Sequence, residues 1–123
     1  MERNRPWDMR ERTIEFAVRV LDVVEGLPGG VGARKVAGQL AEAGTSIGAN
    51  YHEADTALTL PDRRKSLVTS RKEAQETLYW LKVIQKKWAA RIDVRADIIE
   101  TGELVAILNR MITNLEKQIR AAS

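Results

Sequence analysis

The sequence predicts an all-α fold in a single domain covering residues 1–123, arranged as an antiparallel up-down-up-down four-helix bundle. Three observations predict this class. Apolar residues recur at three- and four-residue intervals through four segments, and glycine and proline interrupt the pattern between them. Alternating runs and hairpin dipeptides, which would indicate β-strands, are missing. A chain of 123 residues suits one hydrophobic core and leaves no room for a second.

The first helix is predicted at about residues 9–25. Asp8 precedes it with Glu11 three positions later, the pattern of a capping box. The segment 26–32 ends this helix because it holds four glycines and Pro28. The apolar stripe expected to face the core consists of Ile14, Ala17, Val18, Leu21 and Val24.

The second helix is predicted at about residues 33–53. Gly44 and Gly48 lie inside it, four residues apart on one face. Each glycine costs about 1 kcal/mol relative to alanine in a helix, so we expect a neighbouring helix to pass close there. A ligand that needs access to the backbone is the alternative. The expected core stripe consists of Val36, Leu40, Ala43, Ile47, Tyr51 and Ala54.

The third and fourth helices are predicted at about residues 62–89 and 94–121. Pro61 suits the first turn of the third helix, and Asp93 can cap the fourth. The third helix is expected to bury Leu67, Ser70, Ala74, Thr77, Leu78, Leu81, Ile84 and Trp88. The fourth is expected to bury Ile98, Leu104, Ile107, Leu108, Met111, Leu115 and Ile119.

No residue pattern indicates an enzyme, a metal site or a cofactor site, so we expect none. The chain has no cysteine and one histidine, His52, which excludes thiolate metal sites and the two Glu-x-x-His pairs of di-iron bundles. Glu73 and Glu76 suit surface ion pairs better than acid–base catalysis. The glycine-rich turn at 29–32 lacks the preceding strand and the following Lys-Ser/Thr of a nucleotide site.

The charge is uneven along the chain. Residues 1–61 hold seven basic and nine acidic side chains, whereas residues 62–95 hold ten basic and four acidic ones. Such asymmetry can mark a surface that faces a polyanion, or simply a solvated helix face. The candidate nucleic-acid-binding residues are Arg63, Arg64, Lys65, Arg71, Lys72, Lys82, Lys86, Lys87 and Arg91.

Large apolar side chains also lie away from the predicted core side of the third helix. Tyr79 and Val83 fall opposite this side, and Trp80 lies on its flank. Exposed groups of this kind mark interfaces, so these three residues are the candidate oligomer interface. A third helix that is buried on more than one side is the alternative.

The N-terminal residues are charged and are followed by no apolar stretch, so they do not form a signal peptide. The longest apolar runs are far shorter than the ~20 residues that span a bilayer. We therefore expect a cytoplasmic protein with no membrane contact.

Three segments resemble one known family, the four-helix-bundle proteins of the 23S rRNA intervening-sequence type. Residues 45–54, TSIGANYHEA, resemble its Ser-Ile-x-x-Asn-x-x-Glu stretch. Residues 70–81, SRKEAQETLYWL, resemble its Ser-x-x-Glu-x-x-Glu-Thr-x-Tyr-Trp-Leu run, and residues 103–108, ELVAIL, resemble its final helix. The order and spacing fit over about residues 13–117. The glycine-rich connector at 26–32 departs from the usual pattern.

This resemblance implies a ring-like homo-oligomer, a pentamer, with no enzymatic activity. The chain is similar also to the accessory variability protein of diversity-generating retroelements, which works with a reverse transcriptase and nucleic acid. Two functions follow. One is an oligomeric scaffold or accessory protein with a protein partner, and the other is binding of RNA or DNA through a basic surface of the oligomer.

Overall fold

The computed structural model describes residues 8–123, with side chains from Met9 onward, and contains four helices and no strand within this part of the chain. The helices are α1 (Asp8–Glu25), α2 (Val31–Asp55), α3 (Leu60–Trp88) and α4 (Arg95–Ala122). The predicted all-α class and the existence of all four helices are therefore confirmed. The predicted second and third helices each began two residues too late.

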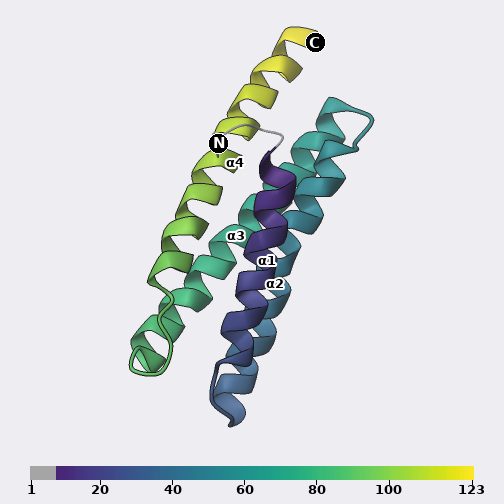
Figure 1. Ribbon diagram of the computed structural model, residues 1–123. Coiled ribbons are helices and arrows are strands. Elements are labelled where there is room, and N and C mark those ends of the chain that lie inside the picture. The colour runs from purple at the N-terminus through teal and green to yellow at the C-terminus, as the bar shows by residue number, and fades with distance from the viewer. Residues whose placement is uncertain (1–7) are drawn as a thin grey trace.

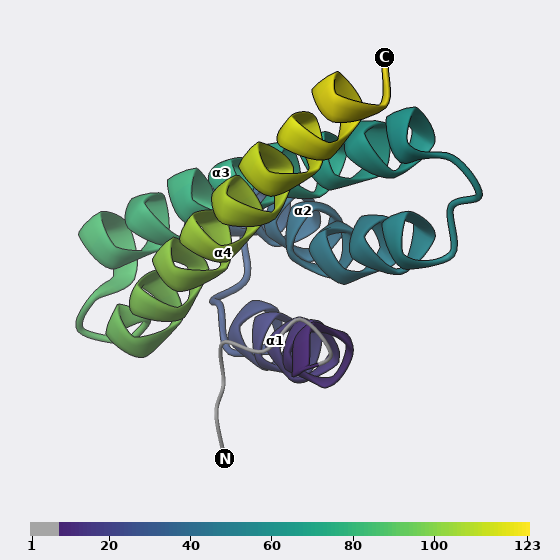
Figure 2. The same cartoon turned by 90° about the horizontal axis from the view of Figure 1, so that it is seen from above.

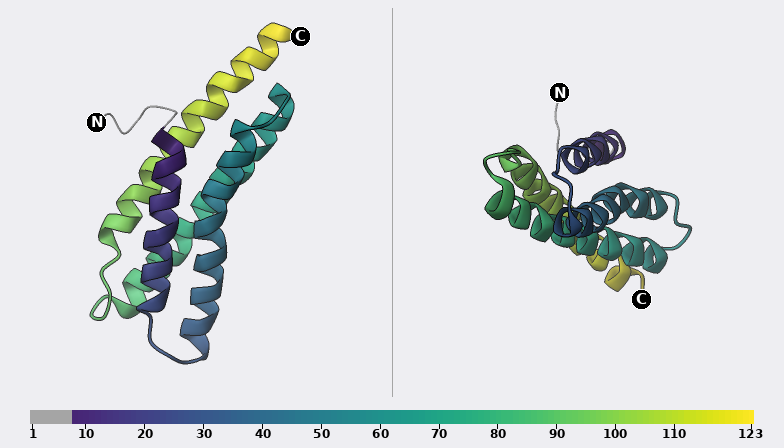
Figure 3. Two further views of the ribbon diagram at one scale, coloured as in Figure 1. Left: turned by 45° about the vertical axis from the view of Figure 1, so that its right-hand side comes forward. Right: turned by 90° about the horizontal axis from the view of Figure 1, so that it is seen from below.

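Each helix packs along the next one in sequence, and the chain reverses direction at each of the three connectors (Figure 1). The longest packed surfaces join α2 to α3 and α3 to α4. By contrast, α1 packs mainly on α2 and meets α4 over only a short stretch. Figure 2 shows α1 set apart from the layer of α3 and α4, with α2 between them. The turned views agree that α1 and α4 are splayed along much of their length (Figure 3).

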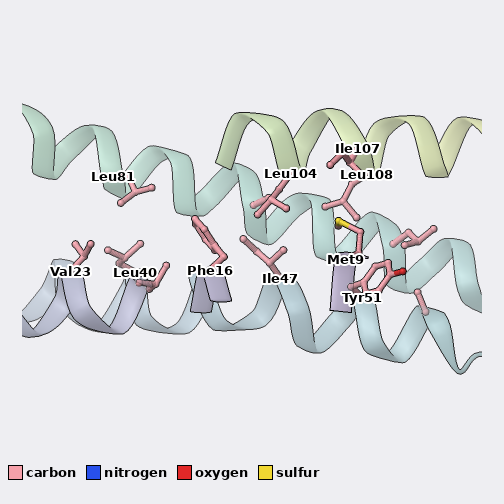
Figure 4. Close-up of a cluster of buried hydrophobic side chains, with 14 of the residues drawn as sticks. Met9, Phe16, Val23, Leu40, Ile47, Tyr51, Leu81, Leu104, Ile107 and Leu108 are labelled. Atoms are coloured by element: carbon pink, nitrogen blue, oxygen red, sulfur yellow. The ribbon is translucent and has the colours of Figure 1, made fainter. Parts of the chain in front are cut away.

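The hydrophobic core lies between the helices and draws on all four of them (Figure 4). Phe16 reaches inward from α1 between Leu40 and Ile47 of α2. Leu81 of α3 and Leu104 of α4 are fully buried on the opposite side. The predicted α2 stripe is confirmed, because every one of its residues is buried: Val36, Leu40, Ala43, Ile47, Tyr51 and Ala54.

The ends of the helices follow from local chemistry. At the start of α3, Thr59 is the N-cap, and its hydroxyl accepts a hydrogen bond from the Asp62 N–H (3.2 Å), with Pro61 in the first turn. At the start of α2, Gly30 has φ 115°, which favours glycine. The N-cap of α4 is Val94 and not the predicted Asp93, which lies one residue earlier; the Asp93 side chain still accepts a hydrogen bond from the Arg95 N–H at 3.0 Å.

The prediction for α1 was wrong in its rotation about the helix axis. Three residues of the predicted core stripe, Ile14, Val18 and Leu21, are exposed. The physical reason is that α1 carries two apolar stripes, both at helical spacing, and only the one containing Phe16 and Val20 fits the core. The residues that α1 buries are Met9, Arg12, Thr13, Phe16, Val20 and Val23.

Gly44 and Gly48 hold α1 close to α2, as predicted. A Cβ on Gly44 would lie 2.7 Å from both methyl groups of Val20, and a Cβ on Gly48 would lie 2.9 Å from Thr13 Cβ. The Thr13 hydroxyl is satisfied within its own helix by the Met9 carbonyl (2.7 Å). The two glycines therefore set the distance between the helices.

No helix of residues 8–123 has the length and apolar content needed to cross a membrane.

Candidate interaction surfaces

The outer face of α3 is basic and carries one exposed aromatic ring. Lys72, Tyr79 and Lys86 follow one another at seven-residue intervals, which brings each to nearly the same side of the helix. Lys65 and Lys82 lie within the same roughly 100° arc. All four lysines are exposed, and Tyr79 is 60% exposed. We call Lys65, Lys72, Tyr79, Lys82 and Lys86 the α3 basic face.

The structure divides the nine basic candidates into two groups. The first group is the lysines, which are all exposed and take part in none of the ion pairs between described residues: Lys65, Lys72, Lys82, Lys86 and Lys87. Lys87 lies about 40° around the helix beyond the edge of the α3 basic face. Because ammonium groups without a carboxylate partner are available to an outside anion, this group keeps its candidacy.

The arginines form the second group, and each one contacts the protein itself. Arg64 pairs with Glu116 of α4 at 2.8 Å, and Arg71 donates to the Asn109 side chain at 2.9 Å. Arg63 is half-buried and donates to the Ala57 carbonyl at 3.5 Å. At the other end of α3, Arg91 donates to the Gly26 carbonyl at 3.4 Å. The nine residues therefore differ in availability, because the arginines have partners within the protein and the lysines belong to no ion pair between described residues.

The predicted interface of Tyr79, Trp80 and Val83 is also divided. Tyr79 points into solvent, whereas Trp80 and Val83 are partly buried and pack against the core. The two rings meet edge to face, with centroids 4.9 Å apart and planes at 81°. Trp80 therefore supports Tyr79 from the side and offers only part of its own surface to a partner.

The outer face of α1 is apolar, and reasoning from the sequence had placed this stripe in the core. Ile14, Val18 and Leu21 are 48%, 54% and 43% exposed. Glu11 and Glu25 lie seven residues before and after Val18, on nearly the same side of the helix. Both glutamates are exposed and belong to no ion pair between described residues. We call these five residues the α1 outer face.

The seam between α1 and α4 is closed by ion pairs. The Arg12 side chain, only 3% exposed, donates to both carboxylate oxygens of Glu100 (2.7 and 2.9 Å) and to Glu103 (2.6 Å). The hydrogen bond to Glu100 raises the pKa of Arg12 despite its burial. Next to it, Arg19 pairs with the buried Asp97 at 3.1 Å.

Burial raises the pKa of Asp97, and the charge of Arg19 opposes this shift only in part. A cleft of about 220 Å³ is lined by residues of both pairs and by Phe16. Four of its charged lining residues, Arg12, Glu100, Arg19 and Asp97, are already engaged with one another. Sequence reasoning missed the buried Arg12, although its place between Met9 and Phe16 in the inner stripe was a signal.

The remaining candidates stay on the surface. His52 is half-buried and meets the Tyr51 ring edge to face, with centroids 6.2 Å apart. Burial, with a smaller contribution from Glu76, raises the pKa of Glu73. Within residues 8–123, no group of three or more histidine, aspartate or glutamate side chains could hold a metal ion.

Comparison with known proteins decides the family. A family model described as 23S rRNA-intervening sequence protein matches residues 6–114, which is most of the chain. The chain belongs to this family. The resemblance read from the three sequence segments is thereby confirmed.

A solved structure agrees with membership of the 23S rRNA-intervening sequence protein family. It is a protein of unknown function from the S23 ribosomal protein family of Bacteroides thetaiotaomicron. It is 30% identical, covers 85% of this chain and 97% of its own, and superposes with a TM-score of 0.74. No curated protein matches the chain. Both the α1 outer face and the α3 basic face lie inside the stretch that the family model matches.

Proposed function

We propose that this chain is a non-enzymatic protein that assembles with copies of itself through the outer faces of an up-down-up-down bundle. It then serves as a scaffold or accessory subunit. The observation that carries the proposal is the exposure of Tyr79, which Trp80 supports on a helix whose opposite side is core. Exposed apolar groups on a rigid, polar-rimmed helix surface are typical of interfaces. The family resemblance favours a ring of five copies.

The assembly is tested by light scattering coupled to size-exclusion chromatography at micromolar concentration. We expect a mass several times the 13.8 kDa of one chain. Tyr79→Asp should lower this mass. Ile99→Asp is the matched control, because Ile99 of α4 is similarly exposed (64%) but lies on neither named face. A wild-type protein that stays monomeric would refute self-assembly.

Binding of RNA or DNA is the second candidate function. The observation that favours it is the set of exposed lysines of α3 that enter no ion pair between described residues. Several copies would multiply this charge, and phosphate contacts make affinity strongly salt-dependent. Such binding would tolerate sequence changes, because no helix carries residues arranged to read base edges.

This second candidate has its own experiment. Affinity for an unstructured RNA and for duplex DNA should fall steeply between about 50 and 200 mM salt. Changing Lys72, Lys82 and Lys86 together to glutamate should abolish binding while the helical content measured by circular dichroism stays unchanged. If wild-type protein binds neither nucleic acid at low salt, the scaffold function stands alone.

A further inference from the structure

We propose that two different faces meet in this assembly: the α1 outer face of one copy packs on the α3 basic face of the next. The inference rests on the proposed self-assembly and names the partner surface within it. It begins from the two features that packing within one copy leaves unexplained. One is the exposed apolar stripe of α1, and the other is the exposed lysine face of α3.

The two faces have the same spacing of side chains. On α1 an exposed apolar residue, Val18, lies midway between two carboxylates. On α3 the exposed ring of Tyr79 lies midway between Lys72 and Lys86. In both cases the charged residues are fourteen positions apart in the sequence, or about 21 Å along a helix. Two helices laid side by side would therefore place apolar groups at the centre and opposite charges at both ends.

The charges on the two faces are complementary and available. Glu11 and Glu25 on α1, like Lys72 and Lys86 on α3, have no partner in the ion pairs between described residues. Asp22 and Glu15 add exposed acidic groups on the flank of α1. An apolar centre with a charged rim of opposite sign is the usual composition of a specific interface.

The two faces cannot meet within one copy, so the proposed contact is between copies. Within a copy α1 and α3 do not lie side by side, because α2 stands between them (Figure 2). A contact between two different faces is heterologous, so each copy offers one face to each of two neighbours. Repetition of this contact builds a ring where the rotation closes. The α3 basic face is then covered by protein and does not bind nucleic acid.

Charge reversal with rescue tests the pairing. The α1 variant is Glu11→Lys with Glu25→Lys, and the α3 variant is Lys72→Glu with Lys86→Glu. For each of these two variants, light scattering should report the mass of a single chain. Combining all four changes restores opposite charges and keeps the net charge, so the mass should return to the wild-type value. Arg110→Glu with Lys117→Glu on α4 is the control. It makes the same change in net charge as the α3 variant on another exposed surface, and it should leave the mass unchanged.

The outcomes separate this inference from the function on which it rests. A monomeric wild type overturns the self-assembly itself. A wild-type oligomer whose mass neither reversal changes leaves self-assembly standing and overturns the pairing of α1 with α3. The pairing is also overturned if the combined variant stays dissociated. It is overturned again if the α3 reversal removes RNA binding without changing the mass, since the lysines then serve a polyanion. Circular dichroism confirms that each variant is folded.

Discussion

Adding one methyl group at Gly44 or Gly48 tests whether close contact with α1 sets the stability of the protein. Alanine favours a helix over glycine by about 1 kcal/mol, so an exposed site would gain from the change. Here, however, the new Cβ of Gly44→Ala would lie 2.7 Å from both Val20 methyl groups. Carbon atoms in contact prefer about 3.5–4.0 Å. The contact is therefore too short by at least about 0.8 Å.

Val20 and Thr13, the residues in short contact, cannot relieve the clash by rotating the end of a long side chain. Val20 is branched at Cβ, which stiffens its side chain in a helix, and its own Cβ is only 3.0 Å from the new methyl position. At Gly48 the short contacts are to Thr13 Cβ and Oγ1, both at 2.9 Å. Relief thus requires α1 to move off α2. Overpacking costs about 1–3 kcal/mol, and we expect a net loss of up to about 2 kcal/mol for each variant after the gain of about 1 kcal/mol in helix propensity.

Gly38→Ala is the matched control within the same helix. It is exposed, and a Cβ there would meet no atom within 4 Å. We therefore expect it to stabilise the protein by about 0.5–1 kcal/mol. The three variants should separate in urea midpoint, measured at one fixed protein concentration because assembly would add to stability.

A double mutant identifies the contact. Val20→Ala removes the two methyl groups that crowd position 44, so Gly44→Ala should cost less in that background than in the wild type. Equal stabilisation by Gly44→Ala, Gly48→Ala and Gly38→Ala would refute the close packing of the two helices.

Two further predictions concern the α1–α4 seam. Arg12→Met should lower the free energy of unfolding by about 1–3 kcal/mol, because it leaves Glu100 and Glu103 facing each other without a cation. Arg12→Lys should also be less stable than the wild type, because an ammonium group cannot make the two parallel hydrogen bonds to Glu100. Urea titration measures the free energy of unfolding of both variants. The pKa of Asp97 is raised in the folded state, so the folded protein binds this proton more tightly than the unfolded chain does. The contribution of Asp97 to stability therefore falls as the pH rises from the ordinary pKa of 3.8 through the raised pKa of the folded state. Urea midpoints between pH 4 and 7 should therefore fall in the wild type relative to Asp97→Asn. A constant difference would contradict the shift.

The sequence predicted best where one apolar pattern stood alone. In α2 the stripe from Val36 to Ala54 has no competitor on the helix, and all of it is buried. The interior glycines Gly44 and Gly48 indicated close packing for a physical reason, their cost in a helix, although the pattern could not name α1 as the neighbour. Helix ends were placed within about two residues because caps and prolines are local signals.

The sequence predicted least where the outcome depends on contacts between distant segments. Two stripes on α1 have equal helical spacing, and only the shape of the α2 surface decides that Phe16 turns inward and Val18 outward. The burial of Arg12 depends on Glu100, 88 positions away. For the same reason the nine basic candidates looked alike in the sequence. Their arginines are held by groups such as Glu116 and Asn109, which belong to α4.

The order of packing along the chain also determines how the molecule can fold. Every large packed surface joins helices that are consecutive in sequence, and only the short meeting of α1 with α4 closes a long loop. Loop closure is the slow, entropically costly part of forming a native topology. The three pairs of consecutive helices can therefore pack before the contact between α1 and α4 forms. Because α1 packs mainly on α2 and meets α4 chiefly through the ion pairs of Arg12 and Arg19, its amide protons should exchange with solvent through openings that leave α2, α3 and α4 packed.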